Sequence, residues 1–227
     1  MSRPSRLATA LFALSFAVAG VIGAIYAFVG EDTYRDLVMP DEPETIALPS
    51  DGTSYARELL VLADRETTAY VLGGPTTLPR TAAGAALFTD GEASHLADVR
   101  LIFEGVRIAL VVALLVLVAL GARARLRRHL MHLMQDGALW AAAVLVALAI
   151  VVVVAFEPAF MAMHYVLFPQ GNFLFDPATS NLLLVYPERY WYGITLRVGA
   201  TFIAMALAVA AAAALAGRWR SPARVIA

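Results

Sequence analysis

The chain has 227 residues, of which 60% are hydrophobic and 15% are charged, and its formal net charge is −1. This apolar fraction exceeds the roughly 45–50% of soluble domains, and the mean hydropathy is +0.72, so an ordinary soluble protein is excluded. The chain contains no cysteine, which excludes disulfides, thiolate metal sites and a cysteine nucleophile.

Four apolar runs predict membrane spans, because each is close to the ~20 residues that a helix needs to cross the hydrocarbon core. Backbone groups in lipid must form their hydrogen bonds internally, so these runs are helices and not strands. We predict an all-α membrane protein, a single integral membrane domain of residues 1–227. Its four transmembrane helices are expected at residues 7–29, 101–122, 137–156 and 197–217.

The first run follows Arg3 and Arg6, as the apolar part of a signal peptide follows a basic start. It covers residues 7–29, which is longer than the roughly 7–15 residues of a cleaved signal. We therefore expect a retained anchor.

The distribution of arginine predicts the orientation. Arginines gather in the amino-terminal tail, in the loop of residues 123–136 and in the carboxyl-terminal tail, whereas residues 30–100 are rich in acidic side chains. Positively charged loops stay in the cytoplasm, so both termini are expected there. Residues 30–100 and 157–196 then form two extracytoplasmic loops. All seventeen basic residues are arginine, which we interpret as the codon bias of a GC-rich bacterium, and the expected location is its cell membrane.

The first outer loop is expected to start irregularly, because prolines interrupt it up to Pro49. A short helix is predicted from Ser54, which can cap it, to the Gly-Gly-Pro sequence at 73–75. Residues 76–90 are expected to be irregular with short strands. Ser94 can cap the next helix, which we expect to continue without a break into the second span.

The second outer loop is rich in aromatic side chains, with nine Phe, Tyr and Trp residues between 160 and 192. Such rings favour the membrane–water interface, so this loop is expected to lie along the membrane surface. Its prolines prevent one long helix.

His95 and Asp98 are the first candidates for catalysis. Their spacing of i, i+3 places them on one helix face. A carboxylate that accepts one ring N–H fixes the tautomer of the imidazole, which is the arrangement of a general base and its orienting group. The alternative is an ordinary first helical turn, in which Ser94 is the cap and the acidic group is favoured by the helix dipole.

His164 is the second candidate, because it follows the third span on the same predicted side as His95. It lies beside Tyr165, and Asn172 and Asp176 follow it. These groups can bind substrate or orient the histidine, and Asn172 can donate to a developing oxyanion. The alternative is an interfacial histidine among aromatic side chains.

Three charged residues lie near the outer ends of spans. Glu104 and Arg107 are expected to form a local ion pair, or to line a headgroup pocket as Arg197 can. Deeper in the spans we find no ionisable residue. An ion-coupled transporter would need one there, so transport is disfavoured.

His129 and His132 have the same i, i+3 spacing in the basic loop. Zinc needs three or four ligands and no third is nearby, so we expect an anionic-lipid contact there and no metal. No nucleotide-binding or nucleophile-elbow motif is present, and no cofactor is expected.

Two blocks resemble the signatures of the lipoprotein intramolecular transacylase family, Lit. The first is LFTDGEASHLADVRLIF at residues 87–103, with its His-x-x-Asp-Val-basic core. The second is MHYVLFPQGNFLFDPATSNLLLVYPE at residues 163–188. The resemblance implies an enzyme that moves the sn-2 acyl chain of a diacylglyceryl cysteine onto its α-amino group and leaves a lyso-form lipoprotein. It also implies that the essential histidines of the family fall on His95 and His164.

This reaction needs no covalent enzyme intermediate, because nucleophile and ester belong to one molecule. The α-amino group titrates near pH ~8 and must be neutral to attack. We expect His95 to be the base, since Asp98 can orient it, and His164 or Asn172 to serve the oxyanion or the leaving group. The two histidines can also exchange these roles.

The expected partners are lipid-modified bacterial lipoproteins and membrane lipids, with no nucleic acid. Two other functions remain open. One is a non-catalytic scaffold or assembly factor of the bacterial envelope, whose acidic outer loop binds a partner. The other is a different lipid acyltransferase or a lipid hydrolase.

Overall fold

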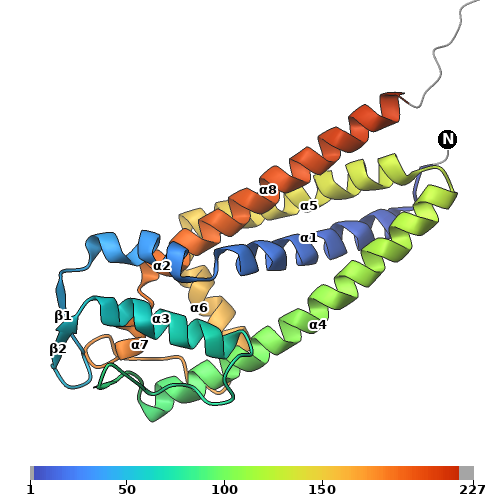
Figure 1. Cartoon of the computed structure of the whole chain (residues 1–227). Helices are drawn as coiled ribbons and strands as arrows, with labels where there is room; N and C mark the ends of the chain where they lie inside the picture. Colours follow the sequence, from blue (N-terminus) through green and yellow to red (C-terminus); the bar gives the residue numbers. More distant parts are fainter. Residues whose placement is uncertain (1–2, 220–227) are drawn as a thin grey trace, which may run out of the picture. The chain divides into compact units, whose positions relative to one another are not determined.

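The computed structural model describes residues 3–219, and within this range four helices are long and apolar enough to cross a membrane (Figure 1). They are α1 (Arg6–Phe28), α4 (Asp90–Leu126), α5 (Leu130–Val154) and α8 (Glu188–Trp219). They correspond to the four predicted spans, so the expectation of an all-α, multi-pass membrane protein is confirmed.

Helix α4 is much longer than a span. It has 37 residues, which at the usual rise make roughly 55 Å, against a hydrocarbon core of about 30 Å. Its apolar run starts at Leu101, whereas the turns before it carry Asp90, Glu92, Asp98 and Arg100. The helix therefore extends beyond its apolar run at the amino-terminal end, and the predicted unbroken passage into the second span is confirmed.

The chain forms two compact units, and each long helix contributes residues to both. Among the described residues, the first unit comprises residues 3–24, Ile108–Val151 and residues 198–219, and the second comprises Ile25–Arg107 and Val152–Arg197.

Small residues let the helices of the first unit approach each other closely. Ala13 of α1 is buried in one cluster with alanines of α5 and α8 and with Phe202, and Phe12 packs against Ala124 and Leu133. A Cβ atom at Gly20 would lie 2.5 Å from Cε of Met205. Such contacts are typical of membrane helices, where close packing replaces the hydrophobic effect.

The second unit contains the short elements between the spans. The first outer loop forms α2 (Glu31–Val38), the 3₁₀ turn η1 (Met39–Asp41), α3 (Glu58–Val71) and two small antiparallel hairpins. The hairpins pair β1 (Thr45–Ala47) with β2 (Ser54–Ala56) and β3 (Thr81–Ala82) with β4 (Ala85–Ala86). The second outer loop forms α6 (Phe156–Leu167) and α7 (Asn181–Val185).

Three local predictions need correction. Ser54 does not cap a helix but starts β2, because it pairs with Ala47, and α3 begins only at Glu58. Helix α2 was expected to be irregular. It forms because Tyr34 and Val38 share its buried face, and the Tyr34 hydroxyl donates to the Val185 carbonyl at 2.6 Å.

The third correction concerns the start of α4, where Thr89 and not Ser94 is the cap. The Thr89 backbone N–H donates to Oε2 of Glu92 at 2.8 Å, and the Glu92 N–H donates to Oγ1 of Thr89 at 3.3 Å. These reciprocal bonds form a capping box. The helix thus begins at Asp90, one turn earlier than predicted.

The Glu92 carboxylate also joins α4 to α7. It is 1% exposed, and its Oε1 accepts hydrogen bonds from the Ser180 hydroxyl at 2.6 Å and from the Leu182 N–H at 2.8 Å. Asn181, which lies between Ser180 and Leu182, is also 1% exposed, and its side-chain amide donates to the Leu87 carbonyl at 3.0 Å. Two outer loops that are distant in sequence are therefore fixed together beside the start of α4.

We predict that Glu92→Ala lowers the stability of the folded protein by at least about 3 kcal/mol, because several buried donors lose their acceptor. For a chain of this size, the melting temperature in detergent micelles should fall by on the order of 10 °C. Glu104→Gln is the matched control, since its half-exposed side chain forms only long ion pairs and its loss should shift the melting temperature little. Equal shifts for both variants would contradict the assigned role of Glu92.

Candidate active site

The second unit brings two histidines from distant parts of the chain together. His95 lies on the extension of α4 that precedes the apolar run, and His164 lies on α6. The centroids of the two imidazole rings are 6.1 Å apart, and the ring planes differ by 23°. Phe168 packs against both rings, at 4.4 Å from His95 and 5.5 Å from His164.

Aromatic rings surround the pair. Phe160 lies 4.2 Å from the His164 ring and Phe173 lies 5.3 Å from it, whereas Phe175 lies 5.7 Å from the His95 ring. Such packing excludes water and strengthens electrostatic interactions within the site.

Burial keeps the His95 imidazole neutral at physiological pH. It is 7% exposed, and this burial, followed by repulsion from His164, lowers its pKa to about 4, although Asp98 and Asn172 act in the opposite direction. Its Nδ1 is buried without a hydrogen-bond partner among the described residues. Two imidazoles this close cannot easily carry positive charge together.

A backbone carbonyl sets the tautomer of His164. Its Nδ1 lies 2.8 Å from the carbonyl oxygen of Phe160, one turn earlier on α6. A carbonyl only accepts, so in the neutral ring Nδ1 carries the proton and donates it. The lone pair then belongs to Nε2, the nitrogen that can accept a proton from a bound molecule.

Asp98 does not orient His95 through a hydrogen bond, which corrects the sequence-based expectation. Its Oδ2 accepts hydrogen bonds from Nδ2 of Asn172 at 2.6 Å and from Nε2 of Gln170 at 2.8 Å. The shared helix face brings Asp98 near the site, but its carboxylate binds the amides of the loop after α6. This bridge fixes the segment that follows His164 against the helix that carries His95.

The remaining predicted residues have other partners. Asp176 accepts from the Ala178 N–H at 2.9 Å and so shapes its own turn. Glu104 and Arg107 form the expected ion pair, at 3.9 Å. Arg197 donates to Oδ2 of Asp36 at 2.6 Å. Tyr165 is 58% exposed, and its ring meets that of Phe173 edge-on.

Arg100 explains the basic position of the first sequence block. Its guanidinium lies 4.8 Å from the centre of the Tyr70 ring and donates to the carbonyls of Tyr70 and Pro75. Arg107 donates to the Leu72 carbonyl at 3.1 Å. These arginines tie the carboxyl end of α3 to α4, because the last carbonyls of a helix lack partners within it.

Sequence reasoning missed Gln170 and Glu92. The Thr89-x-x-Glu92 spacing is a capping-box pattern, so the sequence does indicate the role of Glu92 at the start of the helix. Nothing local marks Gln170, because its partner Asp98 is 72 residues away. Within residues 3–219, no group of three or more His, Asp or Glu side chains is arranged to hold a metal ion.

The sequence of this chain matches one family of known proteins. The family model for "Lipoprotein intramolecular transacylase Lit" matches residues 56–191, more than half of the chain. A search of curated protein sequences finds no significant match.

The fold is also found among solved structures. The in meso structure of the membrane integral lipoprotein intramolecular transacylase Lit from Bacillus cereus superposes with a TM-score of 0.73 and 17% identity. The match covers 94% of this chain and 97% of that one. A form of the same protein with a histidine replaced by alanine gives a TM-score of 0.72 at 16% identity, over 95% and 96% of the two chains. These matches establish a shared fold.

We predict that the imidazole of His95 titrates with a pKa near 4, which NMR of histidine labelled with ¹³C at the ring can measure in micelles. His164→Gln should raise this pKa, because it removes a repulsive neighbour. A pKa close to 6.5 for His95 in the parent protein would contradict the prediction.

The lowered pKa of His95 makes the free energy of unfolding depend on pH. The unfolded chain protonates His95 below pH ~6.5, whereas the folded chain does so only near pH 4. Stability from this group is therefore fully present above pH 6.5 and is lost as the pH falls toward 4. Burial raises the pKa of Asp64 to about 6, which has the opposite effect, so the parent must be compared with His95→Asn. The parent should lose more stability on acidification than this variant.

Proposed function

Because the chain belongs to the lipoprotein intramolecular transacylase family, Lit, we propose that it moves an acyl chain within a bacterial lipoprotein that carries a diacylglyceryl cysteine. The acyl chain passes from the sn-2 oxygen of the glycerol to the α-amino group of the cysteine, and a lyso-form lipoprotein results. The observation that carries this proposal is the imidazole pair on α4 and α6, 6.1 Å apart in an aromatic setting. Both termini face the cytoplasm and the site faces the outer side of the membrane.

His164 acts as the general base. Its Nδ1–H is held by the Phe160 carbonyl, so Nε2 is free to take the proton that the α-amino group loses during attack. This assignment reverses the roles expected from sequence. It is supported by the partners of Asp98, which leave His95 without an orienting carboxylate.

His95 acts as a neutral hydrogen-bond donor. A buried imidazole with a low pKa is a weak base, but its single N–H can donate to the oxygen that becomes negative in the tetrahedral intermediate. When His164 gains its proton, the two rings carry one positive charge between them. The cation on His164 then stabilises the same negative charge.

The steps balance without any further reactant. The amine nitrogen attacks the ester carbonyl carbon, and a C–N bond forms. The C–O bond to the sn-2 oxygen then breaks, and the proton held by His164 passes to that oxygen to give a free hydroxyl. Amine and ester belong to one molecule, so positioning supplies a large part of the rate enhancement.

We predict that His164→Ala and His95→Ala each slow this transfer by at least about 100-fold, the range expected for an acid–base group or an oxyanion donor. The assay uses the purified protein in micelles and a synthetic diacylglyceryl-cysteine peptide. Substrate and product are isomers, so tandem mass spectrometry must locate the acyl chain on the glycerol or on the cysteine nitrogen.

The chain offers a matched control for this assay. His129→Ala and His132→Ala remove the two other histidines, which lie in the first unit, and should leave the rate unchanged. Release of free fatty acid by the parent protein would instead identify a lipid hydrolase. A parent that leaves the peptide unchanged would favour the scaffold function.

A further inference from the structure

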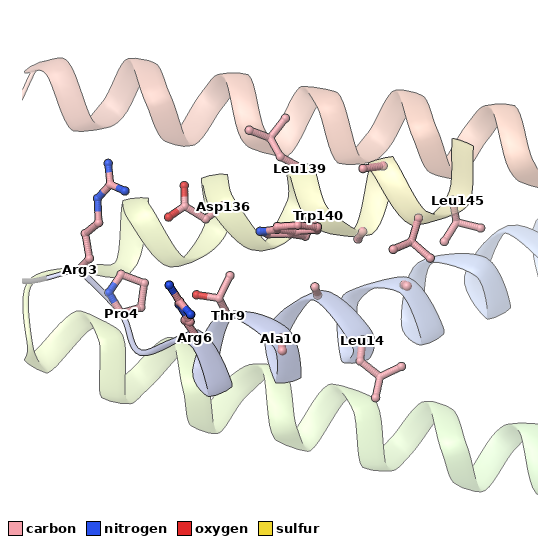
Figure 2. A pocket seen from close by; sticks show the side chains of 15 residues that line it. Arg3, Pro4, Arg6, Thr9, Ala10, Leu14, Asp136, Leu139, Trp140 and Leu145 are labelled. Carbon is pink, nitrogen blue, oxygen red and sulfur yellow. The ribbon is translucent and has the colours of Figure 1, made fainter. Parts of the chain in front are cut away.

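A groove of about 1270 Å³ lies between α1 and α5 within the first unit (Figure 2). None of its lining residues belongs to the candidate active site. Its volume exceeds the 300–1,000 Å³ of ordinary small-molecule pockets, which suits an elongated ligand.

The groove is cationic at one end and apolar at the other. Figure 2 shows Arg3 and Arg6 at one end, with Asp136 opposite them, and Leu14 and Leu145 toward the other end. Trp140 lies between these ends. This gradient matches a lipid, in which a charged headgroup continues into hydrocarbon, and tryptophan favours the depth where the two meet.

The apolar part is open to the hydrocarbon of the membrane. Ala13 and Ala141 are buried in its wall, and their small side chains leave the space. Leu14 and Trp140 are 63% and 64% exposed. Side chains of this kind on a membrane helix meet lipid chains, so an acyl chain can enter the groove from the side.

The polar end carries a surplus of positive charge. Two guanidinium groups face one carboxylate, that of Asp136, and within residues 3–219 no carboxylate lies within ion-pair distance of Arg3 or Arg6. Helix α1 begins at Arg6, and the positive end of its dipole adds to the attraction for an anion.

We propose that this groove binds one anionic phospholipid, with its phosphate held by Arg3 and Arg6 and an acyl chain lying along α1 and α5 past Trp140. Basic pockets between membrane helices recognise anionic headgroups in this way. A zwitterionic lipid would leave the surplus charge uncompensated. A neighbouring apolar helix would fill only the apolar part.

Trp140 supplies the reporter for a test. In a Trp191→Phe/Trp219→Phe chain it is the one remaining tryptophan, and bromine on an acyl chain quenches its fluorescence on contact. The protein is placed in phosphatidylcholine vesicles that contain a minor fraction of brominated phosphatidylglycerol or of brominated phosphatidylcholine. We expect an apparent affinity on the order of tenfold higher for the anionic lipid.

Two double variants distinguish binding in the groove from attraction of anionic lipid by positive charge elsewhere on the protein. Arg3→Gln/Arg6→Gln should abolish the preference, whereas Arg125→Gln/Arg127→Gln, which removes the same charge outside the groove lining, should preserve it. Added inorganic phosphate should not relieve the quenching. Equal quenching by both lipids, an unchanged preference in Arg3→Gln/Arg6→Gln, or displacement of the lipid by phosphate would each overturn the proposal.

Discussion

Two carboxylates on one face of α4 fix the second outer loop on either side of a histidine. Glu92, His95 and Asp98 follow one another at intervals of three residues, so they lie on successive turns of one helix face. Glu92 binds the start of α7, and Asp98 binds the amides of Gln170 and Asn172. The amino-terminal turns of α4, which precede its apolar run, carry this face. These two carboxylates thereby hold the part of the loop that follows His164 against α4.

The two imidazoles that this arrangement brings together differ in their surroundings. His95 lies on the fixed face, is buried and stays neutral. His164 lies on α6, is less buried and has its tautomer set by a carbonyl of its own helix. Aromatic packing brings the rings together without a hydrogen bond between them, which leaves nitrogen atoms available to a substrate. A site of this kind needs no nucleophile of its own when the substrate brings both amine and ester.

The sequence allowed the spans, the candidate histidines and the aromatic loop to be predicted, because hydropathy and short motifs are local properties. It did not reveal α2, whose polar sequence is held by Tyr34 reaching the Val185 carbonyl 151 residues away. It also gave the wrong partner for Asp98. Spacing shows which residues share a helix face, but it does not show which distant amide will reach a carboxylate. Long-range hydrogen bonds of this kind define the site and leave no local signature.

We propose that the two imidazoles act on a single lipid molecule that contains both nucleophile and ester. A crossover experiment tests it directly. The protein is given a mixture of two diacylglyceryl-cysteine peptides, one with heavy isotopes in both peptide and acyl chains and one without, and tandem mass spectrometry follows the N-acylated products. For a transfer within one molecule, we expect heavy acyl chains only on heavy peptides. Products in which heavy and light parts are scrambled would contradict it.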